Sequence, residues 1–157
     1  CGNVLTATPS DGSNSMFPDW YSSGNFQPFT LTARVALPAT TSERFRFGVF
    51  NNGYTANPTG LFLDYDSSVD GNWHCIVDDG SPTSTDVGVA ASTSTVTLTI
   101  SATATGTLTC AVGATSVTAV DTFPAVTYVG FHIKTLTTAS KVMRMRDFRA
   151  QWTGLSR

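Results

Sequence analysis

The amino-acid sequence predicts an all-β protein, an antiparallel jelly-roll β-sandwich of two stacked sheets. Three observations support this prediction. Apolar and polar residues alternate in several short runs, Gly, Asn, Asp and Pro separate these runs, and the strong helix formers Lys and Glu are almost absent from the 157 residues. Alternation with a period of two indicates strands that bury one face, and turn residues between them are typical of antiparallel sheets. About ten strands in one domain of this size favour two stacked sheets over one open sheet.

The predicted strands follow one another along the chain after residue 28. Residues 1–28 are rich in turn residues and are predicted to form an irregular lead-in packed on the domain, which spans 29–157. Strands are expected near residues 29–37, 45–49, 61–66, 73–77, 96–100, 108–112, 117, 126–134 and 140–152. The last of them changes parity along its length, which predicts a β-bulge near Arg146 and Asp147.

Alternate residues of these strands are predicted to build the core. Each of them has polar neighbours in the sequence, as expected for a strand with one buried and one solvated face. The set comprises Phe45, Phe47, Leu61, Leu63, Leu98 and Ile100.

The three cysteines are widely spaced, which argues against a metal cluster and allows at most one internal disulfide. Cys75 and Cys110 both lie within apolar strand patterns, so we expect two buried free thiols, with a disulfide between them as the alternative. The chain begins at Cys1, which leaves open a segment of a longer protein, a processed protein or a bacterial lipoprotein acylated on this residue.

Composition argues against two classes of partner. The formal net charge is -2 and only 13% of the residues are charged, so the chain has no field that would attract a nucleic acid or an anionic bilayer. No window approaches the roughly 20 consecutive apolar residues that a membrane span needs. We therefore expect no nucleic-acid partner and no membrane span.

Several segments between Arg44 and Trp152 follow a recurring order of motifs. They are Arg44–Gly48 (RFRFG), Gly60–Asp66 (GLFLDYD), Gly71–Trp73 (GNW), Thr85–Val89 (TDVGV), Val129–Lys134 and Val142–Phe148. This order resembles the concanavalin A-like lectin and glucanase jelly-roll domains found in tailed-bacteriophage virion proteins. The resemblance implies a capsid decoration, head-fibre or tail-fibre module on the virion surface, and hence an extracellular location.

As partners, the resemblance implies other virion proteins, identical copies in a homo-oligomer, and a host surface glycan. Assembly is the expected primary role and glycan adhesion the second. Two alternatives stay open, a bacterial surface carbohydrate-binding lipoprotein and a glucanase-like glycoside hydrolase.

Catalytic residues are not expected. A retaining glucanase needs two carboxylates about 5 Å apart, but Glu43 is the only Glu in the chain. Asp64 and Asp66 alternate on one predicted strand face, where we expect them to be exposed. His74 and His132 lie within predicted strands without an evident nucleophile. The sequence therefore predicts a non-enzymatic protein.

Exposed aromatic and polar side chains are the candidates for a glycan site. Aromatic rings have an apolar face that can stack on a sugar, and amide or carboxylate groups can bind hydroxyls. The candidate residues are Tyr54, Trp73, Asn51, Asn52 and Asp66.

No cofactor is expected, and calcium is the one candidate ion because hard cations take several oxygen ligands. One predicted hairpin offers such ligands at Asp64, Asp66, Asp70 and Asn72. An interface is expected where apolar residues lie on strand faces opposite the core. These residues are Phe50, Phe62, Phe131 and Ile133.

Overall fold

The computed structural model describes residues 3–7, 28–51, 59–120, 128–136 and 141–152. All the regular elements in these ranges are β-strands, and none of the described residues forms a helix long and apolar enough to cross a membrane. The strands are β1 (Asn3–Ala7), β2 (Phe29–Ala36), β3 (Glu43–Phe50), β4 (Gly60–Asp66), β5 (Asn72–Asp78), β6 (Thr83–Ala90), β7 (Val96–Ala102), β8 (Thr107–Val112), β9 (Thr115–Val120), β10 (Tyr128–Thr135) and β11 (Lys141–Trp152).

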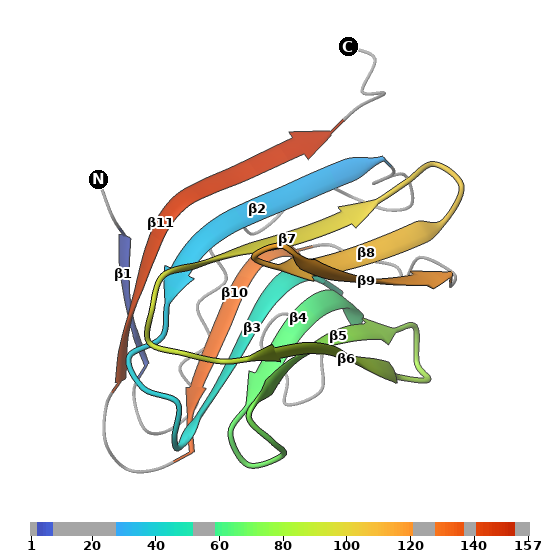
Figure 1. The fold of residues 1–157 in the computed structure, drawn as a ribbon. Helices are drawn as coiled ribbons and strands as arrows, with labels where there is room; N and C mark the ends of the chain where they lie inside the picture. Colours follow the sequence, from blue (N-terminus) through green and yellow to red (C-terminus); the bar gives the residue numbers. More distant parts are fainter. Residues whose placement is uncertain (1–2, 8–27, 52–58, 121–127, 137–140, 153–157) are drawn as a thin grey trace.

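The strands form two antiparallel sheets, so the predicted β-sandwich is confirmed. The six-stranded sheet has the order β1-β11-β2-β7-β8-β9, and the five-stranded sheet has the order β10-β3-β4-β5-β6. Figure 1 shows them as two stacked layers, with β11, β2 and β7 in one layer and β3, β4 and β5 in the other. Across the interface β4 contacts β7 and β8, and β6 contacts β8 and β9. The connectivity is that of a jelly roll.

Two strands occur at positions where the sequence pattern does not predict them. β1 lies within the predicted irregular lead-in and pairs with β11, from Asn3 opposite Met145 to Ala7 opposite Lys141. β6 pairs with β5 at the edge of the five-stranded sheet and is mostly exposed. An edge strand needs little hydrophobic alternation because charged and polar residues protect its free side. The sequence signal of β6 is weak for this reason.

The predicted β-bulge in the last strand is confirmed. The pairing of β11 with β2 shifts register between Arg146 and Arg149. Asp147, inside the bulge, has a φ of 54°, which lies in the left-handed region. Its carboxylate forms an exposed ion pair of 3.3 Å with Arg34. After the bulge Phe148 packs against the core.

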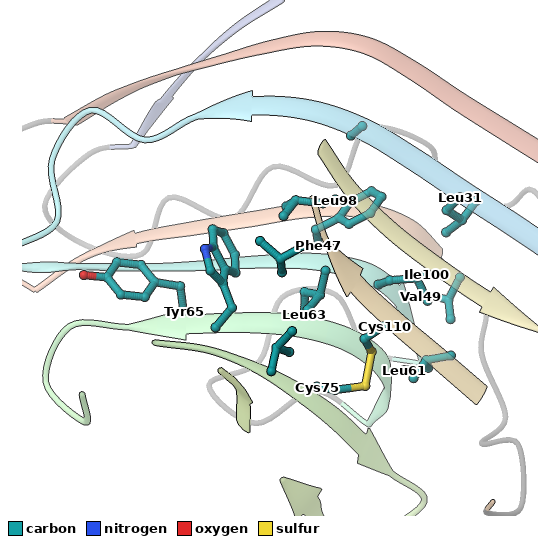
Figure 2. Close-up of a cluster of buried hydrophobic side chains, with 14 of the residues drawn as sticks. Leu31, Phe47, Val49, Leu61, Leu63, Tyr65, Cys75, Leu98, Ile100 and Cys110 are labelled. Carbon is teal, nitrogen blue, oxygen red and sulfur yellow. A yellow bond between two sulfur atoms is a disulfide. The ribbon is translucent and has the colours of Figure 1, made fainter. Parts of the chain in front are cut away.

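The core lies between the two sheets and contains all of the predicted core residues. Phe45, Phe47, Leu61, Leu63, Leu98 and Ile100 are all buried, and Figure 2 shows five of them interleaved from both sheets. Trp73 also belongs to this core and meets the Phe45 ring edge to face, with the ring centroids 5.7 Å apart. Its assignment to a glycan site is therefore wrong, because Trp73 alternates in phase with the other inward residues of β5.

A disulfide joins the two sheets through the core. It links Cys75 of β5 to Cys110 of β8, with the Cα atoms 5.7 Å apart (Figure 2). The expectation of two free thiols is wrong, because both residues occupy inward positions that face each other across the sandwich. The bridge spans 35 residues of sequence, so it restricts the unfolded chain strongly.

The exposure expected for the interface candidates is not observed at Phe50 and Phe62. Phe50 and Phe62 are each only 3% exposed, and their ring centroids lie 5.2 Å apart. The register places Phe131 and Ile133 opposite two core residues of β3. Phe50 and Phe62 alternate with the core positions of their strands, but their burial contradicts the exposed apolar surface expected there. The side chains of Phe131 and Ile133 lie outside the described part of the structure.

Replacing Phe47 with Ala should lower the free energy of unfolding by about 3–5 kcal/mol, because the side chain is fully buried and its loss leaves a cavity. Urea denaturation followed by tryptophan fluorescence measures this change. Val69→Ala is the matched control: Val69 is 71% exposed, so its truncation should change the free energy by less than about 0.5 kcal/mol. Equal effects of the two substitutions would contradict the register.

Replacing both Cys75 and Cys110 with Ala should lower the free energy of unfolding by about 4 kcal/mol, because a closed loop of this length is lost. Denaturation without reductant measures the effect. Titration of the unfolded, unreduced protein should find no thiol at Cys75 or Cys110, and reactive thiols at both positions would disprove the bridge.

Candidate functional site

The face of the five-stranded sheet opposite the core carries a row of ionisable residues. Successive strand residues point to opposite sides, so the residues that alternate with the core positions lie on this face. The register aligns one such residue from each strand, in the order β10, β3, β4, β5, β6: His132, Arg46, Asp64, His74 and Asp86. We call this side of the sheet the outer face and define it by Arg46, Asp64, His74 and Asp86.

Two arginines from β3 meet two aspartates from β4 on the outer face. Arg44 donates from Nε to Oδ1 of Asp64 at 3.0 Å and from Nη2 to Oδ2 of the same carboxylate. The Nε atom also lies 3.4 Å from Oδ2 of Asp66. Arg46 adds a further ion pair, with 3.5 Å between its Nε and Oδ1 of Asp64. Asp64 is therefore held between two guanidinium groups.

Arg46 and Asp64, the centre of this ion-pair cluster, are buried although they face away from the core, whereas Arg44 and Asp66 are partly exposed. Arg46 and Asp64 are 2% and 5% exposed, so the expected exposure of Asp64 is wrong. Burial lowers the pKa of Arg46, and the charge of Asp64 opposes that effect. For Arg44, burial also acts against the charged form, but the hydrogen bonds and charge of Asp64 outweigh it and raise the pKa. A buried ion pair of this kind is stable only while both partners are present.

An aromatic surface adjoins the cluster on the same face. The guanidinium carbon of Arg46 lies 5.5 Å from the centre of the Phe62 ring, which is within the range of a cation–π interaction. Gly48 permits this arrangement, because a Cβ at that position would lie 2.7 Å from Cβ of Phe62 and 2.2 Å from the backbone oxygen of Leu61. Phe62 therefore extends the buried part of the outer face.

The outer face becomes accessible over β5 and β6, where His74 forms the centre of a second group. Its Nε2 lies 2.9 Å and 3.1 Å from the two carboxylate oxygens of Asp70, which comes from the turn before β5. On the other side of the ring, Nδ1 lies 3.3 Å from the hydroxyl oxygen of Ser84 in β6. The His74 side chain is 19% exposed and that of Asp70 is 43% exposed. Solvent and ligands can therefore reach this group.

Hydrogen bonds hold the carboxylates around His74 in their ionised form. The backbone N–H of Asn72 donates to Asp70 at 2.8 Å, and this bond, together with that from His74, lowers the pKa of Asp70 below its ordinary value. Asp86 accepts from the backbone N–H of Gly88 at 2.7 Å and from the Asn72 side chain at 2.9 Å, and its pKa is lowered likewise. Because the Asp70 carboxylate only accepts hydrogen bonds, the neutral imidazole of His74 carries its hydrogen on Nε2 and its lone pair on Nδ1.

The calcium candidates are divided between these two groups. Asp64 and Asp66 face Arg44, whereas Asp70 binds His74. Asp66 also accepts from the backbone and hydroxyl of Ser68, as a turn residue does. Within the described ranges no group of three or more His, Cys, Asp or Glu side chains is arranged to hold a metal ion.

The glycan candidates are also separated. Asn51 is exposed at the end of β3, and Asp66 belongs to the ion-pair cluster described above. Tyr54 and Asn52 lie outside the described residues. The expected glycan site is therefore not assembled by the residues that the structure describes.

The sequence contained a signal for the ion-pair cluster but hardly any for the His74 group. Basic residues alternate with Phe on one predicted strand and acidic residues alternate with Leu and Tyr on the next, which is a pattern for cross-strand ion pairs. By contrast, the contact of His74 with Asp70 needs the turn at Gly71, and its contact with Ser84 needs the register of β5 with β6.

A cavity of about 640 Å³ lies on the other sheet, at the ends of β2, β7 and β11, and its lining contains no charged residue among those described.

Comparison with known proteins identifies the fold class. The structure is similar to a family 7 alginate lyase, A1-II′, with a TM-score of 0.61 and 12% sequence identity over 84% of this chain and 66% of the lyase. It is similar to an alginate lyase from Pseudomonas aeruginosa, with a TM-score of 0.59 and 16% identity over 82% of this chain and 66% of that one. The receptor-binding domain of botulinum neurotoxin D matches with a TM-score of 0.58 and 11% identity over 99% of this chain and 41% of the toxin domain.

The chain therefore has the concanavalin A-like jelly-roll fold that these enzymes and toxin domains share. It spans slightly less than two thirds of the length of the first two lyases. At these identities the similarity establishes the fold and not the activity. No protein-family model matches the sequence, and no curated protein sequence matches it.

These comparisons correct the function inferred from the sequence. The interpretation as a non-enzymatic phage virion protein is wrong, because the similar structures include several alginate lyases and give no support to a virion origin. The comparisons also contradict the prediction of a non-enzymatic protein, because several of the structures that share this fold are lyases. The glucanase-like alternative, which assigned a polysaccharide-cleaving activity to this fold, agrees better with the comparisons.

Replacing Asp64 with Ala should lower the free energy of unfolding by about 3–5 kcal/mol, because it leaves Arg44 and the buried Arg46 without their shared carboxylate. Chemical denaturation at neutral pH measures the effect. Asp79→Ala, at an exposed turn position, is the control and should change the free energy by less than about 0.5 kcal/mol. A small effect at position 64 would mean that the carboxylate is hydrated rather than enclosed.

Proposed function

We propose that this protein is a polysaccharide-degrading enzyme that cleaves its substrate at the accessible part of the outer face. The observation that carries this proposal is the Asp70–His74 pair, which lies one strand away from the ion pair of Arg44 with Asp64. Asp70 orients the imidazole through Nε2 and leaves the lone pair on Nδ1 for proton transfer. An open sheet surface of this kind suits a long polymer better than a small molecule.

The charges around His74 favour elimination over hydrolysis. A glycoside hydrolase of the usual kind needs one carboxyl group that holds a proton at the working pH. The pKa values of Asp70 and Asp86 are lowered, which is the wrong direction for that role. Asp64 and Asp66 both face the guanidinium of Arg44. Of the described carboxylates on this face, none suits a general acid, whereas His74 suits a base.

Elimination requires a substrate whose sugar units carry a carboxylate. The base removes the proton from the carbon next to that carboxylate, the electron pair forms a C=C bond, and the glycosidic oxygen leaves and takes up a proton from water. The hydroxide that remains takes the proton back from the base. In the proposed reaction Nδ1 of His74 accepts the proton, and the partly exposed guanidinium of Arg44 stabilises the charge that develops on the carboxylate. The proposed substrate class is a uronate-containing polysaccharide, and five of the similar structures are of three lyases named after one such polymer, alginate.

The disulfide supports a place for this activity outside the reducing interior of a cell. Buried disulfides form and persist in oxidising compartments, and Cys75–Cys110 crosses the centre of the core. We propose that the protein is exported and meets its polysaccharide there.

His74→Ala should reduce elimination by about 10²–10⁴-fold, the usual contribution of a positioned base. The assay follows the ultraviolet absorbance of the new C=C bond on alginate and other uronate polymers. Asp79→Asn is the control, because it changes an aspartate away from the outer face and should retain the activity of the unmodified protein. New reducing ends without the C=C absorbance would mean hydrolysis. Absence of cleavage on all polymers tested, or cleavage unaffected by His74→Ala, would disprove the proposal.

A further inference from the structure

Ser84 lies in contact with the base nitrogen of His74, and the proposed elimination does not use it. Its hydroxyl oxygen is 3.3 Å from Nδ1. Ser84 lies on β6, opposite Ile76 of β5, and is exposed on the outer face. A serine on an exposed strand usually turns its hydroxyl to water, so its position against an oriented imidazole is the feature to explain.

Three side chains form a continuous hydrogen-bonded series on this surface. Asp70 accepts from Nε2 of His74 at 2.9 Å, and Nδ1 on the opposite side of the ring faces Ser84. With the hydrogen on Nε2, the lone pair on Nδ1 can only accept, so Ser84 donates its O–H to the imidazole. A nucleophile, a base in hydrogen-bond reach of it and a third group that orients the base are the parts of an activated serine.

We propose that Ser84 is a nucleophile activated by His74 and Asp70, and that this group hydrolyses acyl esters. The order of contacts is that of a serine hydrolase, although the two ring nitrogens exchange the roles they have in the chymotrypsin-type arrangement. The identity of Ser84 as nucleophile rests on its own contacts. The assignment of the ester to an acylated polysaccharide rests on the proposed function, because the polymer would occupy the same face.

The reaction balances with water as the only co-reactant. The Ser84 oxygen forms a bond to the ester carbonyl carbon, and its proton passes to Nδ1 of His74. The C–O bond to the sugar then breaks, and the sugar oxygen takes that proton, which leaves an acyl group on Ser84. A water molecule gives a proton to Nδ1 and attacks the acyl carbon, and the product acid leaves as Ser84 regains its proton.

The surroundings of Ser84 define the kind of ester that fits. Asp70 and Ser84 are exposed and His74 is partly exposed, so a substituent that projects from a polymer can reach the hydroxyl. β6 is the last strand in the order of the five-stranded sheet. An edge strand has alternate N–H groups that do not pair with its neighbour, and backbone N–H groups are the usual donors to the oxyanion of acyl transfer. The proposed substrate carries a small acyl group on a sugar hydroxyl.

The test is covalent labelling of the whole protein with a fluorophosphonate probe, read by mass spectrometry of the peptides. We expect the label on Ser84, with at least about a 100-fold lower labelling rate in His74→Ala, because the base is lost. Hydrolysis of p-nitrophenyl acetate should fall by a similar factor in Ser84→Ala. Ser116→Ala is the matched control, since Ser116 is also an exposed strand serine but lies on β9 of the other sheet. It should retain both signals.

Circular dichroism of each variant verifies that it is folded, and Asp70→Asn provides a second variant that keeps the shape of the orienting side chain. Labelling spread over many serines, no labelling of Ser84, or ester hydrolysis unchanged in Ser84→Ala would overturn the proposal. Elimination is measured separately on a polymer without acyl groups. If elimination is absent but Ser84 is labelled, the proposed function is refuted and Ser84 is still the nucleophile. If Ser84 is labelled but no acylated polysaccharide releases acyl groups, the assignment of the substrate is refuted.

Discussion

The antiparallel register of β3, β4 and β5 is the constraint on which the rest of this structure depends. It sets Phe47 opposite Leu63 and Leu63 opposite Cys75, so three strands present a continuous apolar layer to the other sheet. The same register brings Arg46, Asp64 and His74 together on the outer face. A shift of one residue would exchange the two faces of each strand. Core packing and site geometry are thus two consequences of one pairing.

The buried ion pairs fix the shape of the outer face, but their desolvation raises the free energy of the folded state. Removing Arg46 and Asp64 from water opposes folding, and their mutual attraction offsets that cost only if the geometry is maintained. Phe62 covers one side of the Arg46 guanidinium, and Gly48 leaves the space for this ring. These contacts rigidify the strand that lies beside His74. A rigid neighbouring strand is what a catalytic group needs to hold its position.

Two activities are proposed for one imidazole, and the chemistry makes them compatible. Both require an orienting carboxylate on Nε2 and a lone pair on Nδ1, which Asp70 provides. They differ in what donates the proton, a carbon of the substrate in elimination or the Ser84 hydroxyl in ester hydrolysis. The jelly-roll fold itself does not decide between them, since the same fold occurs in lyases and in toxin receptor-binding domains. Any activity on this fold therefore depends on the side chains that the sheets present, here those of the outer face.

The sequence by itself determined which strand residues turn inward. The alternation around Phe45, Leu61 and Ile100 is local, and burial of the apolar side follows from it. The bulge at Asp147 was predictable for the same reason, because a change of parity is visible within one strand. Asp64, by contrast, looked like an ordinary exposed strand aspartate, since its arginine partners lie on another strand.

Only the tertiary structure decided which residues meet across strands and sheets. Cys75 and Cys110 are separated by 35 residues and lie on different sheets, so their bridge depends on how the layers stack. Ser84 reaches His74 only through the pairing of β5 with the edge strand β6, for which the sequence carries a weak signal. The physical reason is that alternation specifies the face on which a side chain lies but not its neighbours on that face, which the register and the stacking of the strands set.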